Sequence, residues 1–593
     1  MLFSVIPAGI TAGAANDSWA GSWGTPAIES GVVLGDSENG LHLQDYIPAN
    51  STIRTVITPT IGGTKIRLKF SNYFSPKPVT LDETTVALTG ETNDVVVEDS
   101  ITQVTFNGGQ KSVTIAAGSE VYSDPVTFKT TAHKDISIST YFKNRTYIYT
   151  EGLYGGVTYM AAVLGNRTHK ENMTVAASRL TFTSGSITYY TIPFLTRLDV
   201  YAPDAYCVVL LGDSTLTNEI STMLSEKLHA NGIHNVGVVM SGIIGNALLH
   251  EGTGLLGKVY GEALLKRAER DAFTVAGAKY VIVKIGENDV LHPMLKSNEG
   301  KLPPVTASQI IAGYRQLAKQ AYGRGIKLYL CTRTPYKGYT RNFMGSDDLE
   351  WSQQGEDTLL EINSWVKNSC TSFNYAGHID LDAVRDPKDP AKLRDHMTTD
   401  GVHFSQYGQI AVTDLIPEYA YGVDRELKDY SQIIGIDPYV APVVETPTKK
   451  PDNNANNNQN NSSEEKTTEG TNKKPVIGEA EATTKPSSGP SSGVVITPNI
   501  NIGNNNTVNN NTQQLPNANE ILVQDPMGND SVNGNVVNVS SEAARQMAGF
   551  AILAAVAMAI IAVASVMLVK MRPSSGSSLA RGGKGRANQK KRV

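Results

Sequence analysis

Cysteine is scarce in this chain of 593 residues, which contains only Cys207, Cys331 and Cys370. Each lies within or beside an apolar run, where a free cysteine commonly packs as a small hydrophobic side chain. A disulfide framework is therefore excluded as the basis of the fold. The ten histidines are scattered singly, without the spacing of a Cys/His metal site, so we expect no metal and no cofactor.

Charged residues are also sparse, at 18% of the chain, and they leave a net charge of -5 at pH 7. Basic residues cluster only at the extreme C-terminus, so no nucleic-acid partner is expected. A chain of this length is too long for one hydrophobic core, which predicts at least two folded units with accessory segments.

The N-terminal region lacks basic residues, since no lysine or arginine precedes Arg54. Residues 1–15 are apolar and small, and they end in a sequence that suits signal-peptidase cleavage. The basic segment that normally begins a signal peptide is missing. We interpret residues 1–15 as the remnant of a signal peptide whose start site is assigned too late.

A long uncharged stretch near the C-terminus predicts a membrane anchor. Residues 547–569 form a run of 23 residues without a charge, long enough at about 1.5 Å per residue to cross a hydrocarbon core of roughly 30 Å. We assign a transmembrane helix to residues 544–570; the alternative is a buried helix of a soluble domain. Residues 571–593 are basic without an acidic residue, which predicts a cytoplasmic tail and an extracellular location for the preceding domains.

The composition changes completely before this anchor. Residues 441–543 are rich in Pro, Thr, Lys and Glu and then in Asn, with few aromatic side chains. Such a segment cannot bury enough apolar surface to offset the entropy of ordering, so we expect a disordered linker that tethers the protein through a cell wall.

Residues 16–198 predict an all-β sandwich, jelly-roll-like in outline. Period-two patterns such as residues 64–70 alternate with turn signals such as Gly62-Gly63 and Asp124-Pro125. Antiparallel strands of this kind pack as two sheets. The sandwich could bind carbohydrate, or it could only support the following domain.

Residues 199–440 alternate strand-like and helix-like patterns. Apolar strands are predicted at residues 207–211, 236–240, 279–285, 326–332 and 378–381. Helical spacing recurs at residues 310–321 and 359–366. This alternation predicts a three-layer α/β domain with a parallel sheet, flavodoxin-like in outline.

Four motifs punctuate this α/β region. They are Gly212-Asp213-Ser214, Gly242-Ile243-Ile244-Gly245-Asn246, Gly286-Glu287-Asn288-Asp289 and Asp400-Gly401-Val402-His403-Phe404-Ser405. Their residue types and order resemble the SGNH (GDSL-type) hydrolase superfamily. The N-terminal segments resemble the sandwich that precedes one branch of this superfamily, at residues 19–23, 68–72, 104–109 and 123–126.

The resemblance implies a catalytic triad. Ser214 would be the nucleophile at a strand-to-helix turn, and His403 would be its general base and later the general acid toward the leaving group. Asp400, three residues before His403, would accept a hydrogen bond from the imidazole Nδ1.

The resemblance also implies an oxyanion hole made of the Ser214 N–H, the Gly245 N–H and the Asn288 side-chain amide. Gly242 is the alternative to Gly245, which we prefer because the pattern of the family that this chain resembles puts this glycine just before a polar residue, here Asn246. Glu287 stands where many relatives carry glycine or isoleucine, and it either points away or shapes the substrate pocket.

Other polar residues near the motifs have structural interpretations. Asp213 and Asp289 are expected to bond to local backbone N–H groups. His292 and His396 either have no role in the site or contact the substrate, because neither has a spacing that would let it replace His403.

These features predict a membrane-tethered extracellular serine esterase that hydrolyses carboxylic esters without a cofactor. An acylated carbohydrate is the expected substrate, by resemblance to the sandwich-bearing branch. A lipid or lysophospholipid esterase is the alternative within the enzyme class. A non-catalytic glycan-binding or adhesion protein on a hydrolase scaffold is the alternative outside it.

Overall fold

A computed structural model describes most of the chain between residues 17 and 443. The described ranges are 17–30, 32–34, 41–43, 46–152, 157–173, 192–217, 219–252, 260–296, 302–339, 342–343, 346–347 and 349–443. In these ranges no helix combines the length and apolar character needed to span a bilayer. The predicted signal-peptide remnant, the linker beyond residue 443, the transmembrane helix and the basic tail lie outside the described residues.

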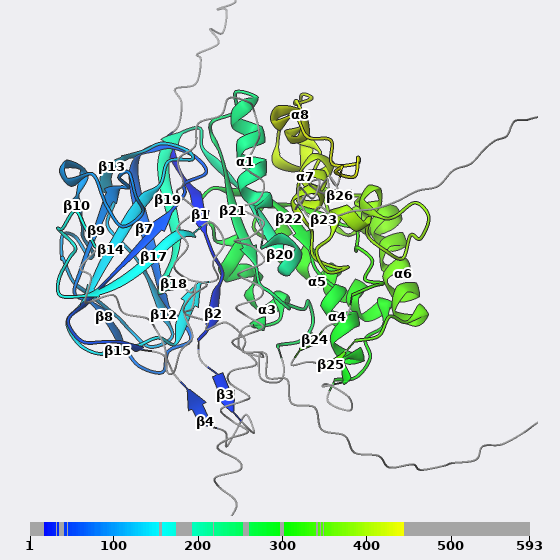
Figure 1. Cartoon of the computed structure of the whole chain (residues 1–593), viewed down its shortest axis with the longest axis horizontal. Helices are drawn as coiled ribbons and strands as arrows, with labels where there is room; N and C mark the ends of the chain where they lie inside the picture. Colours follow the sequence, from blue (N-terminus) through cyan, green and yellow to red (C-terminus); the bar gives the residue numbers. More distant parts are fainter. Residues whose placement is uncertain are drawn as a thin grey trace, which may run out of the picture. The chain divides into compact units, whose positions relative to one another are not determined.

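The N-terminal region consists of two five-stranded antiparallel sheets (Figure 1). One sheet has the order β1-β19-β7-β12, with β13 also paired to β7, and the other has the order β10-β9-β14-β6-β17. Their bounds are β1 Asp17–Gly24, β6 Ser51–Ile57, β7 Gly63–Asn72, β9 Glu83–Leu88, β10 Thr102–Val104, β12 Ser119–Tyr122, β13 Val126–Thr130, β14 Ile136–Phe142, β17 Val157–Leu164 and β19 Leu195–Pro203.

Short two- and three-stranded ribbons complete this region. They are formed by β2 Ala27–Glu29, β3 Val32–Leu34, β4 Leu41–Leu43, β5 Tyr46–Ile47, β8 Val79–Leu81, β11 Val113–Ile115, β15 Thr146–Tyr147, β16 Thr150–Gly152 and β18 Ile192–Pro193. One hydrophobic cluster joins both five-stranded sheets, including Leu68, Phe70 and Phe142. Two antiparallel sheets around one core form the predicted sandwich, whereas its jelly-roll connectivity stays a prediction.

The second region is built on a parallel five-stranded sheet with the order β21-β20-β22-β23-β26. In chain order this arrangement is 2-1-3-4-5, the order of flavodoxin-like sheets. The strands are β20 Tyr206–Gly212, β21 Val236–Gly242, β22 Ala278–Lys284, β23 Lys327–Cys331 and β26 Gly377–Ile379. All five predicted strands are therefore confirmed.

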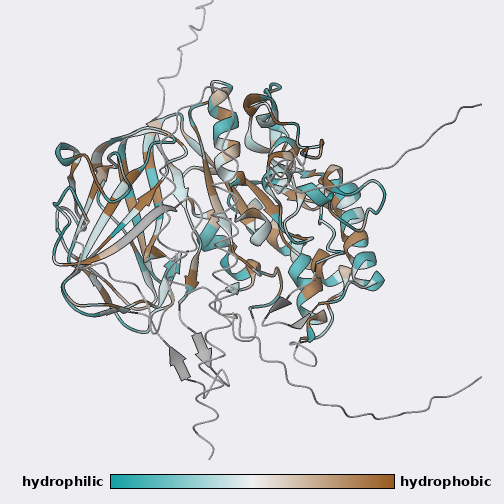
Figure 2. Cartoon of the chain, viewed as in Figure 1, coloured by the Kyte–Doolittle hydropathy of each residue, from teal (hydrophilic) through white to brown (hydrophobic). Residues whose placement is uncertain are grey.

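Helices cover both faces of this sheet, which makes the domain three-layered. One hydrophobic cluster packs α3, α5 and α6 on one face, and another packs α1 and α7 on the opposite face. Figure 2 shows the hydrophobic strands between helices with hydrophilic outer faces. The helices are α1 Ile220–Ala230, α3 Leu264–Ala268, α4 Glu287–Leu291, α5 Ala307–Tyr322, α6 Gln353–Ser369, α7 Gln406–Leu415 and α8 Tyr430–Ile434.

The three cysteines are free and buried, as predicted from their apolar surroundings.

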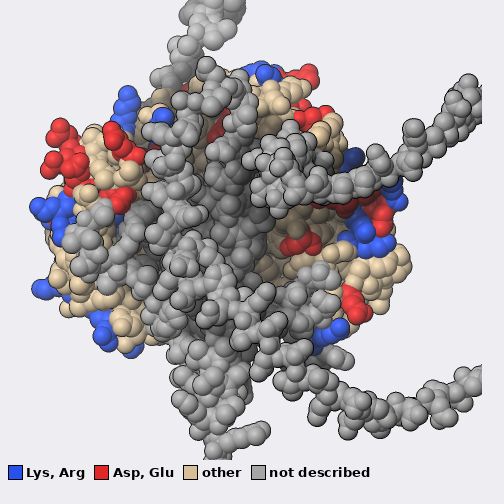
Figure 3. All heavy atoms as spheres, in the orientation of Figure 1, with Lys and Arg blue, Asp and Glu red and all other residues tan. Residues whose placement is uncertain are grey.

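On the described surface in view, lysine and arginine side chains are interspersed with aspartate and glutamate (Figure 3).

The sandwich contacts the α/β domain directly, at β21 and just before β22. Thr60 Oγ1 accepts a hydrogen bond from Val238 N at 3.0 Å, and Gly21 N donates to Ala276 O at 2.9 Å. β19 runs through the predicted boundary between residues 198 and 199, because it pairs with β1 and β7 as far as Pro203 and Tyr201. The sandwich strand thus leads into β20 after only two intervening residues.

Candidate active site

Ser214 lies at the carboxyl end of β20, where a buried strand turns into a short 3-10 helix, Ser214–Leu216. Asp213 caps this helix by accepting a hydrogen bond from Thr215 N at 3.0 Å. In this sheet of order 2-1-3-4-5, the chain leaves the neighbouring strands β20 and β22 toward opposite edges, so the carboxyl ends of these two strands open a crevice. Ser214 is placed at that crevice and is 6% exposed.

His403 reaches Ser214 from a loop that precedes α7. Thr398 Oγ1 donates to His403 O at 2.9 Å, and Thr399 N donates to the same carbonyl at 3.0 Å. Gly401 has a φ of +95°, and a Cβ there would approach Tyr339 N to 2.7 Å, so the turn requires glycine.

A continuous chain of hydrogen bonds joins the three predicted triad residues. Ser214 Oγ lies 2.9 Å from His403 Nε2, and His403 Nδ1 lies 2.6 Å from Asp400 Oδ2. The carboxylate acceptor assigns the proton to Nδ1, which leaves Nε2 free to accept from the serine hydroxyl. The imidazole is therefore oriented as a base toward Ser214.

Asp400 is held as an anion in this arrangement. Its other oxygen, Oδ1, accepts hydrogen bonds from Val402 N at 3.0 Å and His403 N at 2.8 Å. Burial raises the pKa of Asp400, but the hydrogen bond and attraction to His403 outweigh it and bring the pKa below its ordinary value. The carboxylate can therefore stabilise a positive charge on the imidazole.

The three predicted oxyanion donors follow the carboxyl ends of β20, β21 and β22: Ser214 begins a 3-10 helix, Gly245 lies in a loop, and Asn288 is on α4. Asn288 Nδ2 donates one of its two hydrogens to Asn246 O at 2.9 Å. This hydrogen bond holds the Asn288 side chain against the residue that follows Gly245. Among the described residues, the backbone N–H groups of Ser214 and Gly245 donate no hydrogen bond to the protein. Unused donors at this edge are what a developing oxyanion requires.

Gly245 and Gly242 are glycines for different reasons. Gly245 has a φ of +67° and packs against the ring of Tyr260, where a Cβ would come within 2.3 Å. Gly242 ends β21, and a Cβ there would lie 2.8 Å from Asp213 O. Gly242 thus permits close strand packing, and Gly245 permits the loop conformation.

Glu287 points into the protein, away from solvent. It forms an ion pair with Lys284, the last residue of β22, and its Oε2 lies 3.7 Å from Arg333. Thr334 N donates to its Oε1 at 3.2 Å. Burial raises the pKa of Glu287, but the two cations and these hydrogen bonds outweigh it and bring the pKa to about 2. Of the two predicted alternatives, the structure favours a carboxylate that points away from the site.

Asp213 bonds locally, as predicted, to Thr215 N and Thr215 Oγ1. The local prediction for Asp289 is wrong. Its carboxylate accepts from Leu248 N at 2.7 Å and Leu249 N at 2.9 Å, on a loop some forty residues earlier in the chain. Asp289 therefore joins the loop after β21 to α4, a contact that its neighbours in sequence could not predict.

His292 and His396 do not approach the serine as alternative bases. His292 is 5% exposed and stacks on Tyr260 at a centroid separation of 5.3 Å. His396 Nε2 hydrogen-bonds Pro438 O at 2.9 Å.

Sequence reasoning missed the buried cations behind the site, Lys284, Arg333 and Arg267, all 0% exposed. Lys284 interrupts the apolar run of β22 and stands three residues before Glu287. This spacing of opposite charges could have predicted the ion pair from the sequence. Arg267 gives no comparable signal. Among the described residues, no group of three or more His, Cys, Asp or Glu could hold a metal ion.

Residues 208–416 match the family model described as GDSL-like Lipase/Acylhydrolase. Among solved structures, the chain is similar to an acetyl xylan esterase, with 20% identity and a TM-score of 0.26 over 37% of this chain and 100% of that one. An acetylxylan esterase from Geobacillus stearothermophilus has 18% identity and a TM-score of 0.28 over 37% and 95%. A GDSL-like lipase from Bacteroides thetaiotaomicron has 16% identity and a TM-score of 0.27 over 36% and 87%. No curated relative matches the chain.

Proposed function

We propose, from the premise that residues 208–416 are a domain of the GDSL-like lipase/acylhydrolase family and so a carboxylic ester hydrolase, that this protein is a cell-surface serine esterase. The observation that carries the proposal is the hydrogen-bonded chain from Ser214 through His403 to Asp400, with distances of 2.9 and 2.6 Å.

In the first half of the reaction, Ser214 Oγ attacks the ester carbonyl carbon while His403 Nε2 takes the hydroxyl proton. The carbonyl π electrons move to oxygen, and the resulting oxyanion accepts hydrogen bonds from the N–H groups of Ser214 and Gly245 and from Asn288 Nδ2. His403 then gives the proton to the leaving alkoxide, which departs as an alcohol and leaves an acyl-enzyme.

In the second half, water attacks the acyl carbon and His403 Nε2 accepts its proton. The tetrahedral intermediate collapses, Ser214 Oγ leaves and recovers the proton, and a carboxylic acid is released. Asp400 remains a carboxylate throughout, because its pKa lies below its ordinary value.

The test uses p-nitrophenyl acetate with the full chain. The wild-type protein should release p-nitrophenol, and Ser214→Ala should reduce release to background while the circular dichroism spectrum is unchanged. Ser364→Ala, on the helix α6 away from the triad, is the matched control and should keep wild-type activity. Equal rates for wild type and Ser214→Ala would refute the esterase proposal and favour a non-catalytic surface protein.

The proposed substrate is an acylated carbohydrate, in which the acyl group is an acetyl or another small acid. Support comes from the N-terminal sandwich and from the segments that resemble the sandwich-bearing branch, at residues 19–23 and 68–72. Released acid should be measured from acetylated xylan and from lysophosphatidylcholine vesicles in parallel. Faster release of acid from lysophosphatidylcholine than from acetylated xylan would refute the carbohydrate proposal and favour a lipid esterase.

The proposed location is the cell membrane, with the esterase outside and the tail in the cytoplasm. It rests on the uncharged residues 547–569 and on the basic residues that follow them. Full-length protein should stay in the membrane fraction after alkaline carbonate washing, and a chain that ends at residue 543 should be released. Release of the full-length protein by the same wash would refute the anchor.

A further inference from the structure

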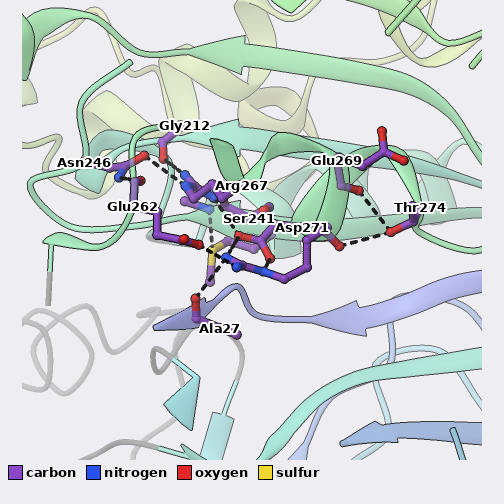
Figure 4. Close-up of polar contacts among 12 residues, drawn as sticks. Ala27, Gly212, Ser241, Asn246, Glu262, Arg267, Glu269, Asp271 and Thr274 are labelled. Carbon is purple, nitrogen blue, oxygen red and sulfur yellow. Dashed lines mark hydrogen bonds and ion pairs between the residues drawn. The ribbon is translucent and has the colours of Figure 1, made fainter. Parts of the chain in front are cut away.

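A buried arginine connects the loops that carry the candidate site. Arg267, on α3, donates to the backbone carbonyls of Gly212 at 2.8 Å and of Ser241 at 3.1 Å. It also donates to Asn246 Oδ1 at 3.0 Å. Figure 4 shows these acceptors converging on Arg267 from separate segments of the chain.

Two of these acceptors lie within two residues of the candidate nucleophile and of a candidate oxyanion donor. Gly212 is two residues before Ser214, and Asn246 is the residue after Gly245. The backbone carbonyl of Asn246 in turn accepts the hydrogen bond from Asn288. The guanidinium of Arg267 therefore contacts the segment that leads to Ser214 and also the loop that contains Gly245 and Asn246, which we call the Gly245 loop. Through Asn246 it is also linked to Asn288.

The side chain of Asn246 is fixed in one orientation by this contact. Its Oδ1 accepts from Arg267, and its Nδ2 donates to the carbonyls of Tyr260 and Glu262, both at 2.8 Å. Tyr260 also packs on Gly245. The conformation of the Gly245 loop thus depends on a hydrogen-bond network with Arg267 at its centre.

The buried positive charge of Arg267 is balanced by the carboxylate of Asp271. Asp271 Oδ2 lies 3.4 Å from its guanidinium, and Arg270 Nε donates to Asp271 Oδ1 at 2.7 Å. Arg197, on the sandwich strand β19, donates to Asp271 O at 3.2 Å. Burial lowers the pKa of Arg267 to about 10, which leaves it charged at neutral pH. An apolar side chain in this place would leave buried carbonyl oxygens without a donor.

We propose that Arg267 is a positioning residue of the active site, which sets the distance between Ser214 and the oxyanion donors Gly245 and Asn288. The proposal rests on the proposed esterase function. Donors arranged in advance stabilise the transition state, and a displacement of about 1 Å can cost on the order of 10²-fold in rate. The role differs from a purely structural one because it acts on kcat and leaves substrate binding unchanged.

The test compares Arg267→Lys with Arg54→Lys in the full chain. Arg54 is a matched control, since it is also 0% exposed and also donates to backbone carbonyls, at Asp94 and Lys170 in the sandwich. With p-nitrophenyl acetate, Arg267→Lys should lower kcat by about 10- to 100-fold and change KM by less than about threefold. Arg54→Lys should lower the melting temperature and leave kcat within about twofold of wild type.

A second readout separates positioning from general loss of stability. Methylboronic acid forms a tetrahedral adduct with a serine nucleophile, so its Ki depends on the oxyanion donors. The Ki should rise for Arg267→Lys by about the same factor as kcat falls and stay unchanged for Arg54→Lys. If kcat and Ki of Arg267→Lys both match wild type, the positioning role is refuted.

A further variant keeps the proposal testable if Arg267→Lys does not fold. Asn246→Ala removes the link between Arg267 and the Gly245 loop, and it should lower kcat by at least about tenfold with little change in KM. A kcat of Asn246→Ala within about twofold of wild type would refute the proposal. A wild-type chain without esterase activity would refute the proposed function itself, whereas an active wild type with unaffected variants would refute only the role of Arg267.

Discussion

Replacement of Glu287 by glutamine tests how the charges behind the site are balanced. Glu287 forms ion pairs with Lys284 and Arg333, and the side chains of both cations are 0% exposed. The substitution keeps the shape of the side chain but removes its charge, so two buried cations lose their counterion. Removing one partner of a buried ion pair typically costs about 3–5 kcal/mol of folding free energy.

Asp213 should reduce this cost. Burial raises the pKa of Asp213, and the nearby charge of Glu287 raises it further. When a neutral glutamine replaces Glu287, the repulsion on Asp213 falls, and the attraction of Lys284 then favours the ionised form of the Asp213 carboxyl. We therefore expect a loss near the lower end of the range, about 3 kcal/mol.

The assay is urea unfolding followed by the helical circular dichroism signal. This signal reports the α/β domain, because the described part of the sandwich has no α-helix. With a urea m value of about 2–3 kcal/mol per M, the midpoint of Glu287→Gln should fall by about 1–1.5 M.

Glu269→Gln is the matched control. Glu269 pairs with Arg324, and these side chains are 43% and 54% exposed. An exposed pair contributes about 0–1 kcal/mol, so this variant should shift the midpoint little. Equal midpoint shifts for the two variants, or no shift for Glu287→Gln, would refute the inference that Glu287 neutralises buried cations.

Three further predictions concern the triad, the oxyanion hole and a histidine cluster. Asp400→Asn should lower kcat by about 10³- to 10⁴-fold with little change in KM, measured with p-nitrophenyl acetate, because the imidazole loses the acceptor that orients it. Asn288→Ala should lower kcat by about 10²- to 10³-fold, and Asn368→Ala, on α6, should not; equal kcat values would remove Asn288 from the oxyanion hole. Burial, with repulsion from His133 and His234, lowers the pKa of His229 from 6.5 to about 4. Between pH 6.5 and pH 4 the unfolded chain therefore binds more protons than the folded chain, so the free energy of unfolding decreases as the pH falls. For this half-buried ring the loss should be about 1–2 kcal/mol after allowance for solvent screening, and thermal unfolding from pH 6.5 to pH 4 should show a smaller loss for His229→Gln.

Much of the fold was predictable because its signals are local. The apolar run that ends at Gly212 is long enough for a strand buried on both faces, and β20 forms there. The helix-spaced residues 310–321 lie within α5, and residues 359–366 lie within α6. The boundary near residue 198 was harder to place, since β19 is defined by its pairing with β1 and β7 and not by a change in composition.

The site was predictable to the extent that its residues stand in short motifs. Ser214, Asp400 and His403 were selected from two such motifs, and the structure brings them into one hydrogen-bonded chain. The environment of Glu287 was left open, because its partners include Arg333, far along the chain. The assignment of Asp289 to local backbone groups failed for the same reason.

From the sequence one can derive the alternation of strands and helices in residues 199–440, the turns that end β20 and β22, and the residue types available for acyl transfer. These properties follow from side-chain periodicity and from motifs within a few residues. It takes the packed fold to bring Arg267 against Gly212 and Asn246 and to neutralise the charge of Glu287 inside the protein. Buried polar groups must find partners wherever the packed chain brings them close, and that proximity is not encoded in neighbouring residues.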